Sequence, residues 1–176
     1  MLGLAAVSAL LVSCGGSSSK ASAPEAQMMA RPLPAASIAP LEGGAARPVA
    51  EVTRGKVAVI DIWATWCGAC KNVAATLELL ADARKHTDLL IVGVDVGEDR
   101  ETVARYFDGK QPRYPIYLDP DFAVANGLSQ TELPAVVVVD RTGTVRLVGR
   151  KVDKAMVKLV DELLAAPAAA PTPPSP

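Results

Sequence analysis

Two short, almost continuously apolar segments limit the possible folds of this chain more than any other feature. Residues 57–63 read VAVIDIW and residues 89–96 read LLIVGVDV. Runs of this kind are typical of central strands that are covered on both faces. Between them, apolar residues recur at the spacing of one helix face: Val73, Ala74, Leu77, Leu80 and Ala81. The pattern predicts a helix over residues 67–85 and a βαβ unit in which the two strands run parallel.

The later segments predict further elements of the same domain. Helices are expected over residues 101–107, 121–126 and 152–164, with a short strand over residues 115–118. Two more apolar runs, residues 135–140 and 144–148, flank a three-residue loop that contains Gly143. This arrangement predicts an antiparallel hairpin. The order of elements predicts an α/β domain with a mixed central sheet and helices on both faces.

The two ends of the chain lack these patterns. Residues 15–48 are rich in Gly, Ser, Ala and Pro without a sustained period, which predicts a flexible linker. Residues 166–176 predict an Ala/Pro-rich tail. The folded domain is therefore expected over residues 49–165, a length that can bury a core of its own.

The N-terminal residues indicate export. Residues 2–12, LGLAAVSALLV, form an uncharged apolar run that is too short to span a bilayer and is typical of a signal peptide. Leu11-Val12-Ser13-Cys14 resembles the bacterial lipobox, which implies a signal peptide over residues 1–14 and a lipid anchor on Cys14. No Lys or Arg precedes the run, which departs from the usual pattern. The alternative is an apolar terminus with an incidental cysteine.

Charge and cysteine content exclude several classes of protein. The chain has 18 Lys and Arg against 19 Asp and Glu, which argues against nucleic-acid binding. Its three cysteines are too few for a disulfide scaffold. A single Cys-x-x-Cys pair supplies only half of the usual zinc ligands, so no metal site is expected. No glycine-rich phosphate loop is present in the sequence, and no cofactor is expected.

The motif that carries chemistry is Trp66-Cys67-Gly68-Ala69-Cys70, where the first predicted strand meets the helix. Unpaired N–H groups and the positive end of the helix dipole favour a thiolate at Cys67. Cys70 is close enough to form a disulfide with it, and the two small residues between them leave the pair accessible. This permits thiol–disulfide exchange, in which Cys67 attacks a substrate disulfide and Cys70 resolves the mixed disulfide.

Four segments carry a family resemblance. Residues 61–71, DIWATWCGACK, resemble the active-site segment of the thioredoxin superfamily. Residues 92–98, 114–128 and 133–145 are similar to the TlpA/ResA branch of membrane-anchored envelope thioredoxins. The resemblance covers residues 49–165 and implies a thioredoxin-like three-layer sandwich. Ala69 departs from the proline of many relatives, and Lys71-Asn72-Val73 lacks the Glu that often follows the pair.

The resemblance also implies roles for individual residues. Pro134 stands at the position of the cis-proline that faces the Cys pair, and Leu133 at that of the residue whose backbone pairs with substrate. Asp61 matches the buried acid of thioredoxin, and burial in an apolar strand should raise its pKa so that it takes the Cys70 proton. The alternative for Asp61 is an acid that is hydrogen-bonded at a strand end. Trp66 is expected to contact substrate beside Gly68 and Ala69.

Two other groups of residues are given structural roles. Trp63 is interpreted as a core residue. Asp95, Asp119 and Asp140 end strands or begin turns, where Asp often accepts hydrogen bonds from backbone N–H groups.

Taken together, the sequence predicts a monomeric envelope thiol–disulfide oxidoreductase, anchored by lipid on the periplasmic side of a membrane. The resemblance implies that it reduces protein disulfides, such as those of apocytochrome c or copper-site proteins, and that a membrane thiol–disulfide donor supplies its electrons. One alternative is a disulfide oxidant or isomerase on the same scaffold. The other is a non-catalytic binding module in which Cys67 and Cys70 form a structural disulfide.

Overall fold

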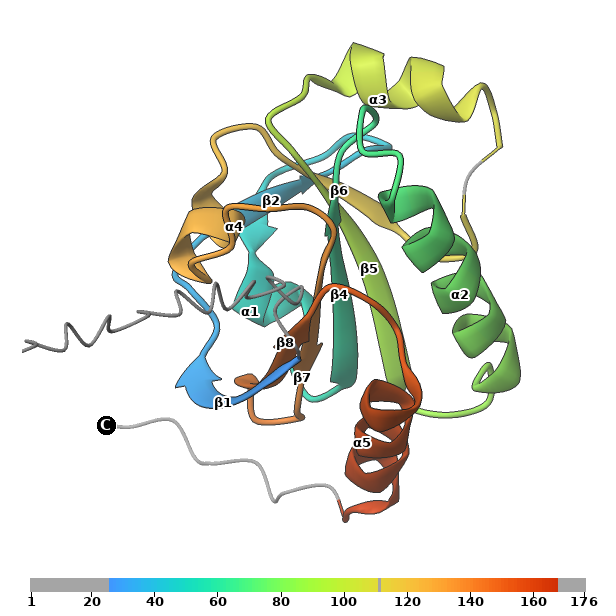
Figure 1. Ribbon diagram of the computed structural model, residues 1–176. Helices are drawn as coiled ribbons and strands as arrows, with labels where there is room; N and C mark the ends of the chain where they lie inside the picture. The colour runs from blue at the N-terminus through green and yellow to red at the C-terminus, as the bar shows by residue number, and fades with distance from the viewer. Residues whose placement is uncertain (1–25, 111, 168–176) are drawn as a thin grey trace, which may run out of the picture.

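The computed structural model describes residues 26–110 and 112–167, which form an eight-stranded sheet with helices packed on it (Figure 1). The strands are β1 (Gln27–Pro32), β2 (Ser37–Pro40), β3 (Arg47–Pro48), β4 (Val57–Trp63), β5 (Leu89–Val96), β6 (Ile116–Asp119), β7 (Ala135–Val139) and β8 (Thr144–Gly149). The helices are α1 (Val49–Val52), α2 (Cys70–Ala83), α3 (Arg100–Phe107), α4 (Ala123–Gly127) and α5 (Lys154–Ala165).

The sheet is mixed, as the sequence predicts. Its strand order is β1-β8-β7-β4-β5-β6-β2-β3. Strands β4, β5 and β6 run parallel, and α2 connects the first two, which confirms the βαβ unit. Strands β7 and β8 form the predicted antiparallel hairpin, and β7 lies antiparallel to β4. The strand of the βαβ unit that leads into the Cys pair is therefore central and paired on both edges.

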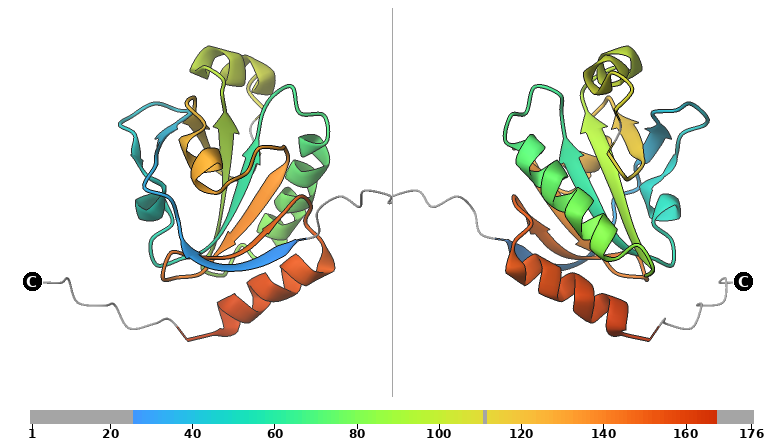
Figure 2. Two further views of the ribbon diagram at one scale, coloured as in Figure 1. Left: turned by 60° about the vertical axis from the view of Figure 1, so that its left-hand side comes forward. Right: turned by 90° about the vertical axis from the view of Figure 1, so that its right-hand side faces the viewer.

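Alternation along the central strands divides the core between the two faces of the sheet. On one face, Val57, Val59 and Trp63 of β4 pack in a cluster with apolar residues of α2, α3 and α5. On the other face, Ala58, Ile60 and Ile62 pack with residues of α1, α4 and β2. Figure 2 shows α2 and α5 together in front of the sheet in its right-hand view. These layers confirm the three-layer α/β sandwich.

The expectation of a flexible linker over residues 15–48 is wrong for residues 26–48. Strand β1 pairs with β8, and β2 pairs with β6 and β3, so this stretch adds three strands to the sheet. Ile38 is completely buried, and Leu33 and Leu41 are also core residues. Pro32 and Pro48 did not prevent this because β1 and β3, which contain them, lie at the edges of the sheet, where a missing N–H is tolerated. The folded domain therefore begins well before residue 49.

The expected signal peptide (residues 1–14), Cys14, residues 15–25 of the expected linker and residues 168–176 of the tail lie outside the described residues. Within residues 26–110 and 112–167, none of the helices has the length and apolar character needed to cross a membrane.

Candidate active site

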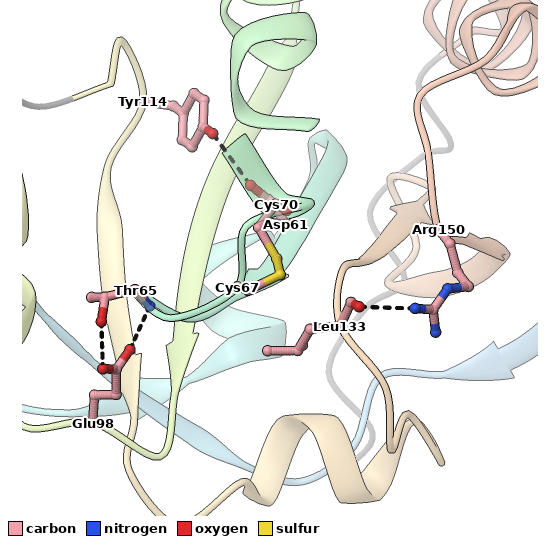
Figure 3. The surroundings of a disulfide bond; sticks show 8 residues. All are labelled: Asp61, Thr65, Cys67, Cys70, Glu98, Tyr114, Leu133 and Arg150. Atoms are coloured by element: carbon pink, nitrogen blue, oxygen red, sulfur yellow. Dashed lines mark hydrogen bonds between the residues drawn. A yellow bond between two sulfur atoms is a disulfide. The ribbon is translucent and has the colours of Figure 1, made fainter. Parts of the chain in front are cut away.

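The two cysteines of the motif form a disulfide at the N-terminus of α2 (Figure 3). Cys67 lies in a turn before the helix, where its N–H donates to the Ala64 carbonyl at 3.0 Å and its carbonyl accepts from the Cys70 N–H at 3.1 Å. The predicted helix start at residue 67 is therefore three residues too early. The Cα atoms of the pair are 5.4 Å apart. The pair still lies beside the positive end of the α2 dipole, which favours a thiolate there.

The two cysteines and the residues around them differ in exposure. Cys67 is 7% exposed and Cys70 is 3% exposed, so the disulfide lies just below the surface. Trp66 projects into solvent with 68% of its surface exposed, and Gly68 and Ala69 are also exposed. This patch is available for contact with another protein. Trp63, in contrast, is buried as predicted, and its ring makes tilted and edge-on contacts with Tyr106 and Phe107 of α3.

The loop before β7 places Leu133 and Pro134, two further residues of the predicted site, near the disulfide. The Leu133–Pro134 peptide bond is cis, as the resemblance implies. Pro134 is buried and Leu133 is half-buried, and Figure 3 shows the Leu133 side chain pointing toward the Cys pair. Leu133 therefore lies beside the Cys pair, and its pairing with a substrate backbone stays a prediction.

Asp61 lies behind the disulfide, in the middle of β4 and only 1% exposed. The Tyr114 hydroxyl donates to its Oδ2 at 3.3 Å, and Oδ1 has no partner among the residues that the structure describes. Burial raises the pKa of Asp61 to about 7, and the Tyr114 hydrogen bond opposes that shift. Asp61 is thus hydrogen-bonded inside β4, two residues before the strand ends. Its role as a proton acceptor stays a prediction.

A cavity of about 530 Å³ opens beside Asp61 and Cys70. It lies between α2 and α3, and the rings of Trp63, Tyr106 and Tyr114 contribute to its walls. Asp61 and Cys70 thus share one space that also reaches solvent.

Sequence reasoning missed a carboxylate that fixes the loop before Cys67. Glu98 accepts the Thr65 N–H and the Thr65 hydroxyl, both at 2.6 Å (Figure 3). Thr65 lies between β4 and Cys67, whereas Glu98 follows β5. The two strands are parallel neighbours, so their carboxyl ends lie side by side. That topology is the signal that would have suggested the contact.

The expected capping role of Asp95 is wrong. Asp95 is paired in register with Trp63, completely buried, and has no hydrogen-bond partner among the described residues on either oxygen. Burial and, after it, the adjacent Glu98 carboxyl raise the pKa of Asp95 to about 8. Asp119 and Asp140 do accept backbone N–H groups, at the start of α4 and in the β7–β8 turn.

The second missed contact concerns Arg150, at the end of β8. Its guanidinium donates to the Leu133 carbonyl at 2.8 Å (Figure 3). It also donates to the Glu132 carboxylate at 2.6 Å. Neither contact is visible in the sequence, because residues 132 and 150 are brought together only by the hairpin. In residues 26–110 and 112–167, no group of three or more His, Cys, Asp or Glu side chains is placed to hold a metal ion.

A thioredoxin-like sheet, a Cys-x-x-Cys disulfide at a helix N-terminus, a buried acid behind it and a cis-proline beside it define a thioredoxin-superfamily protein of the thiol–disulfide type. The Redoxin family model matches residues 23–164, and the chain belongs to this family. The match includes the strands before residue 49.

Individual relatives agree with this assignment. The thiol-disulfide oxidoreductase ResA of Geobacillus kaustophilus is 28% identical over 93 residues, which are 53% of each chain. A thioredoxin of Bacillus subtilis is 46% identical over 57 residues, 32% of this chain and 53% of that protein. The chain spans about half the length of these curated relatives.

Two solved structures share the fold over most of their length. The dsbF protein of Mycobacterium tuberculosis is 25% identical with a TM-score of 0.63, covering 73% of this chain and 95% of that one. A thiol-disulfide oxidoreductase of Bacteroides vulgatus is 24% identical with a TM-score of 0.66, covering 75% and 97%.

Proposed function

We propose that this protein is a thiol–disulfide oxidoreductase of the cell envelope that reduces protein disulfides through Cys67 and Cys70. The observation that carries the proposal is the disulfide itself, just below the surface at the N-terminus of α2 with Asp61 buried behind it. A disulfide with a purely structural role would not require a buried acid behind it or an exposed Trp66 beside it.

The reaction proceeds in two exchanges. In the reduced protein, the Cys67 thiolate attacks one sulfur of a substrate disulfide; a Cys67–substrate bond forms, the substrate S–S bond breaks, and the released thiolate takes up a proton. Cys70 then loses its proton to the Asp61 carboxylate and attacks Cys67. The Cys67–Cys70 disulfide forms, the second substrate sulfur leaves as a thiolate and is protonated, and two electrons have passed to the substrate.

The pKa of Asp61 suits the second exchange. A pKa of about 7 leaves the group able both to accept and to release a proton near neutral pH. The cavity beside it lets that proton leave to solvent. To start another cycle, the Cys67–Cys70 disulfide takes two electrons from an external dithiol, which we propose is a membrane thiol–disulfide donor.

The envelope location rests on the N-terminal sequence. The apolar run of residues 2–12 followed by Ser13-Cys14 supports export and lipidation at Cys14, and the resemblance to the TlpA/ResA branch supports a role on the periplasmic side. Substrates of that branch suggest haem-binding cysteine pairs of apocytochrome c or cysteines of copper-site proteins. Labelling with a radioactive fatty acid, with Cys14→Ser as the control, tests the anchor.

Trapping of mixed disulfides tests the exchange reaction. With Cys70→Ser, the first exchange occurs but the resolving thiol is missing, so substrates should accumulate bound to Cys67. The matched variant Cys67→Ser should trap none. If Cys70→Ser forms no mixed disulfide with another protein, the Cys67–Cys70 disulfide is structural and the proposal fails.

The reduction potential of the Cys67–Cys70 pair tests the direction of electron flow. A value near the roughly −270 mV of thioredoxin supports a reductant, whereas a value near the roughly −120 mV of DsbA indicates an oxidant.

A further inference from the structure

Arg150 lies at the backbone edge that a substrate has to approach. Its Nη2 donates to the Leu133 carbonyl at 2.8 Å, and its Nη1 donates to Glu132 Oε2 at 2.6 Å. Both partners directly precede the cis-proline. In Figure 3 the Leu133 residue lies between the Cys pair and Arg150. The guanidinium therefore holds the Leu133 carbonyl from the side opposite the reacting sulfur atoms.

The Leu133 backbone keeps free hydrogen-bonding capacity despite this contact. Across residues 26–110 and 112–167, no hydrogen bond takes up the Leu133 N–H. The carbonyl oxygen has a second lone pair, so a substrate N–H can bind it while Arg150 stays in place. Arg150 thus fixes the orientation of the pairing edge without closing it.

The Arg150–Glu132 ion pair is exchangeable. The Glu132 side chain is 69% exposed and that of Arg150 is 29% exposed. Ion pairs at such exposed positions contribute little to stability, because water screens the two charges and the side chains lose rotamer freedom. The guanidinium also has N–H donors that neither contact uses. A carboxylate from outside can therefore take the place of Glu132 at little cost.

A polar groove of about 290 Å³ begins at Arg150. Its walls are residues 129–132, residues 148–150 and Gln27 of β1. Among the residues that the structure describes, Glu132 and Arg150 are the only charged side chains that line it. When Glu132 turns to solvent, the groove presents one positive charge next to Leu133. The positive charge of Arg150 then complements an acidic side chain of an extended polypeptide bound in the groove.

We propose that Arg150 is a specificity-determining residue that selects protein substrates with a carboxylate side chain close to the attacked cysteine. The substrate carboxylate replaces Glu132 on the guanidinium, while Arg150 continues to hold the Leu133 carbonyl. Glu132 is the internal stand-in for that carboxylate in the free protein. The inference rests on the proposed exchange function and adds the chemistry of the substrate to it.

The test compares three substrates of the reduced protein. Two are disulfide-linked peptides that differ only by Glu or Gln next to the cysteine, and the third is hydroxyethyl disulfide, which has no backbone. The variants are Arg150→Gln and Glu132→Gln. Arg105→Gln is the matched control, because Arg105 is an equally charged residue paired with Glu101 on α3 and does not line the groove.

We expect wild type and Arg105→Gln to prefer the Glu peptide by about tenfold in kcat/KM. This is the size of a modest charge-assisted hydrogen bond, because the bound peptide shields its carboxylate from the water that weakens the Arg150–Glu132 pair. Arg150→Gln should abolish that preference. Glu132→Gln should increase it through a lower KM for the Glu peptide, because the internal competitor is gone. The preference in wild type should also shrink as salt concentration rises.

Other outcomes overturn the inference. If Arg150→Gln slows all three substrates by the same factor, Arg150 only supports the loop. If wild type reduces all three substrates without preference, the inference fails and the proposed function stands. If wild type reduces none of them, both fail. Because Glu132 is largely exposed, its variant gives an independent result even if Arg150→Gln is poorly folded.

Discussion

The buried Asp61 predicts a specific dependence of stability on pH. Its pKa of about 7 in the folded protein lies above the ordinary value of 3.8, because burial disfavours the carboxylate more than the Tyr114 hydroxyl stabilises it. The folded protein therefore binds this proton more tightly than the unfolded chain does. Stability that depends on the protonated acid is fully present below about pH 4 and is lost as the pH rises through 7.

The size of the effect follows from the shift. A shift of about three pKa units, at about 1.36 kcal/mol each, corresponds to about 4 kcal/mol. Asp61→Asn removes this titration. The free energy of unfolding of Asp61→Asn, minus that of wild type, should therefore increase by about 4 kcal/mol between pH 4 and pH 8. A constant offset from the new amide group does not change that increase.

Urea unfolding of the oxidised proteins at several pH values measures this difference. Asp121→Asn, at an exposed position, controls for the loss of a carboxyl group elsewhere on the surface. Parallel pH profiles of Asp61→Asn and wild type would refute the reasoning, because they would show that Asp61 has the same proton affinity in both states.

Two further variants test other parts of the structure. Glu98→Gln removes the charge that accepts two Thr65 hydrogen bonds, so it should destabilise the protein by about 1–3 kcal/mol in urea unfolding. It should also lower the pKa of Asp95 from about 8, which NMR titration of the carboxyl carbon measures; an unchanged pKa would contradict the coupling. Ile38→Ala should cost about 2–5 kcal/mol, because Ile38 is completely buried. If residues 26–48 were a linker, the same substitution would leave the unfolding free energy unchanged.

The parts of the fold that were predictable have their information in local sequence. The apolar runs of residues 57–63 and 89–96 and the helical spacing after Cys70 specify the βαβ unit without reference to distant residues. Strands β1 and β2 were not predictable in this way. They are short, contain proline and gain their stability from partners in β8 and β6, which are far away in the chain.

The residues of the candidate site also differ in whether local sequence predicts them. Cys67, Cys70 and Pro134 belong to motifs, and the burial of Asp61 follows from the apolar strand around it. Asp95 also lies in an apolar strand, but its place at a strand end suggested a cap. In the sheet, Asp95 is paired in register with Trp63, and its side chain is buried in the core.

The contacts of Glu98 and Arg150 depend on tertiary structure. Glu98 meets Thr65 only because β4 and β5 are parallel, and Arg150 meets Leu133 only because the hairpin returns to the cis-proline loop. A charged residue in a turn carries no local sign of its partner.

The central claim is that Cys67 is an activated, attackable thiol. Alkylation of the reduced protein with iodoacetamide as a function of pH, with the modified residue identified by mass spectrometry, tests it most directly. We predict that Cys67 reacts first, with a pKa clearly below the ordinary value of about 8.5, while the more buried Cys70 is protected. A Cys67 pKa at or above about 8.5, or faster labelling of Cys70, would contradict the proposed mechanism.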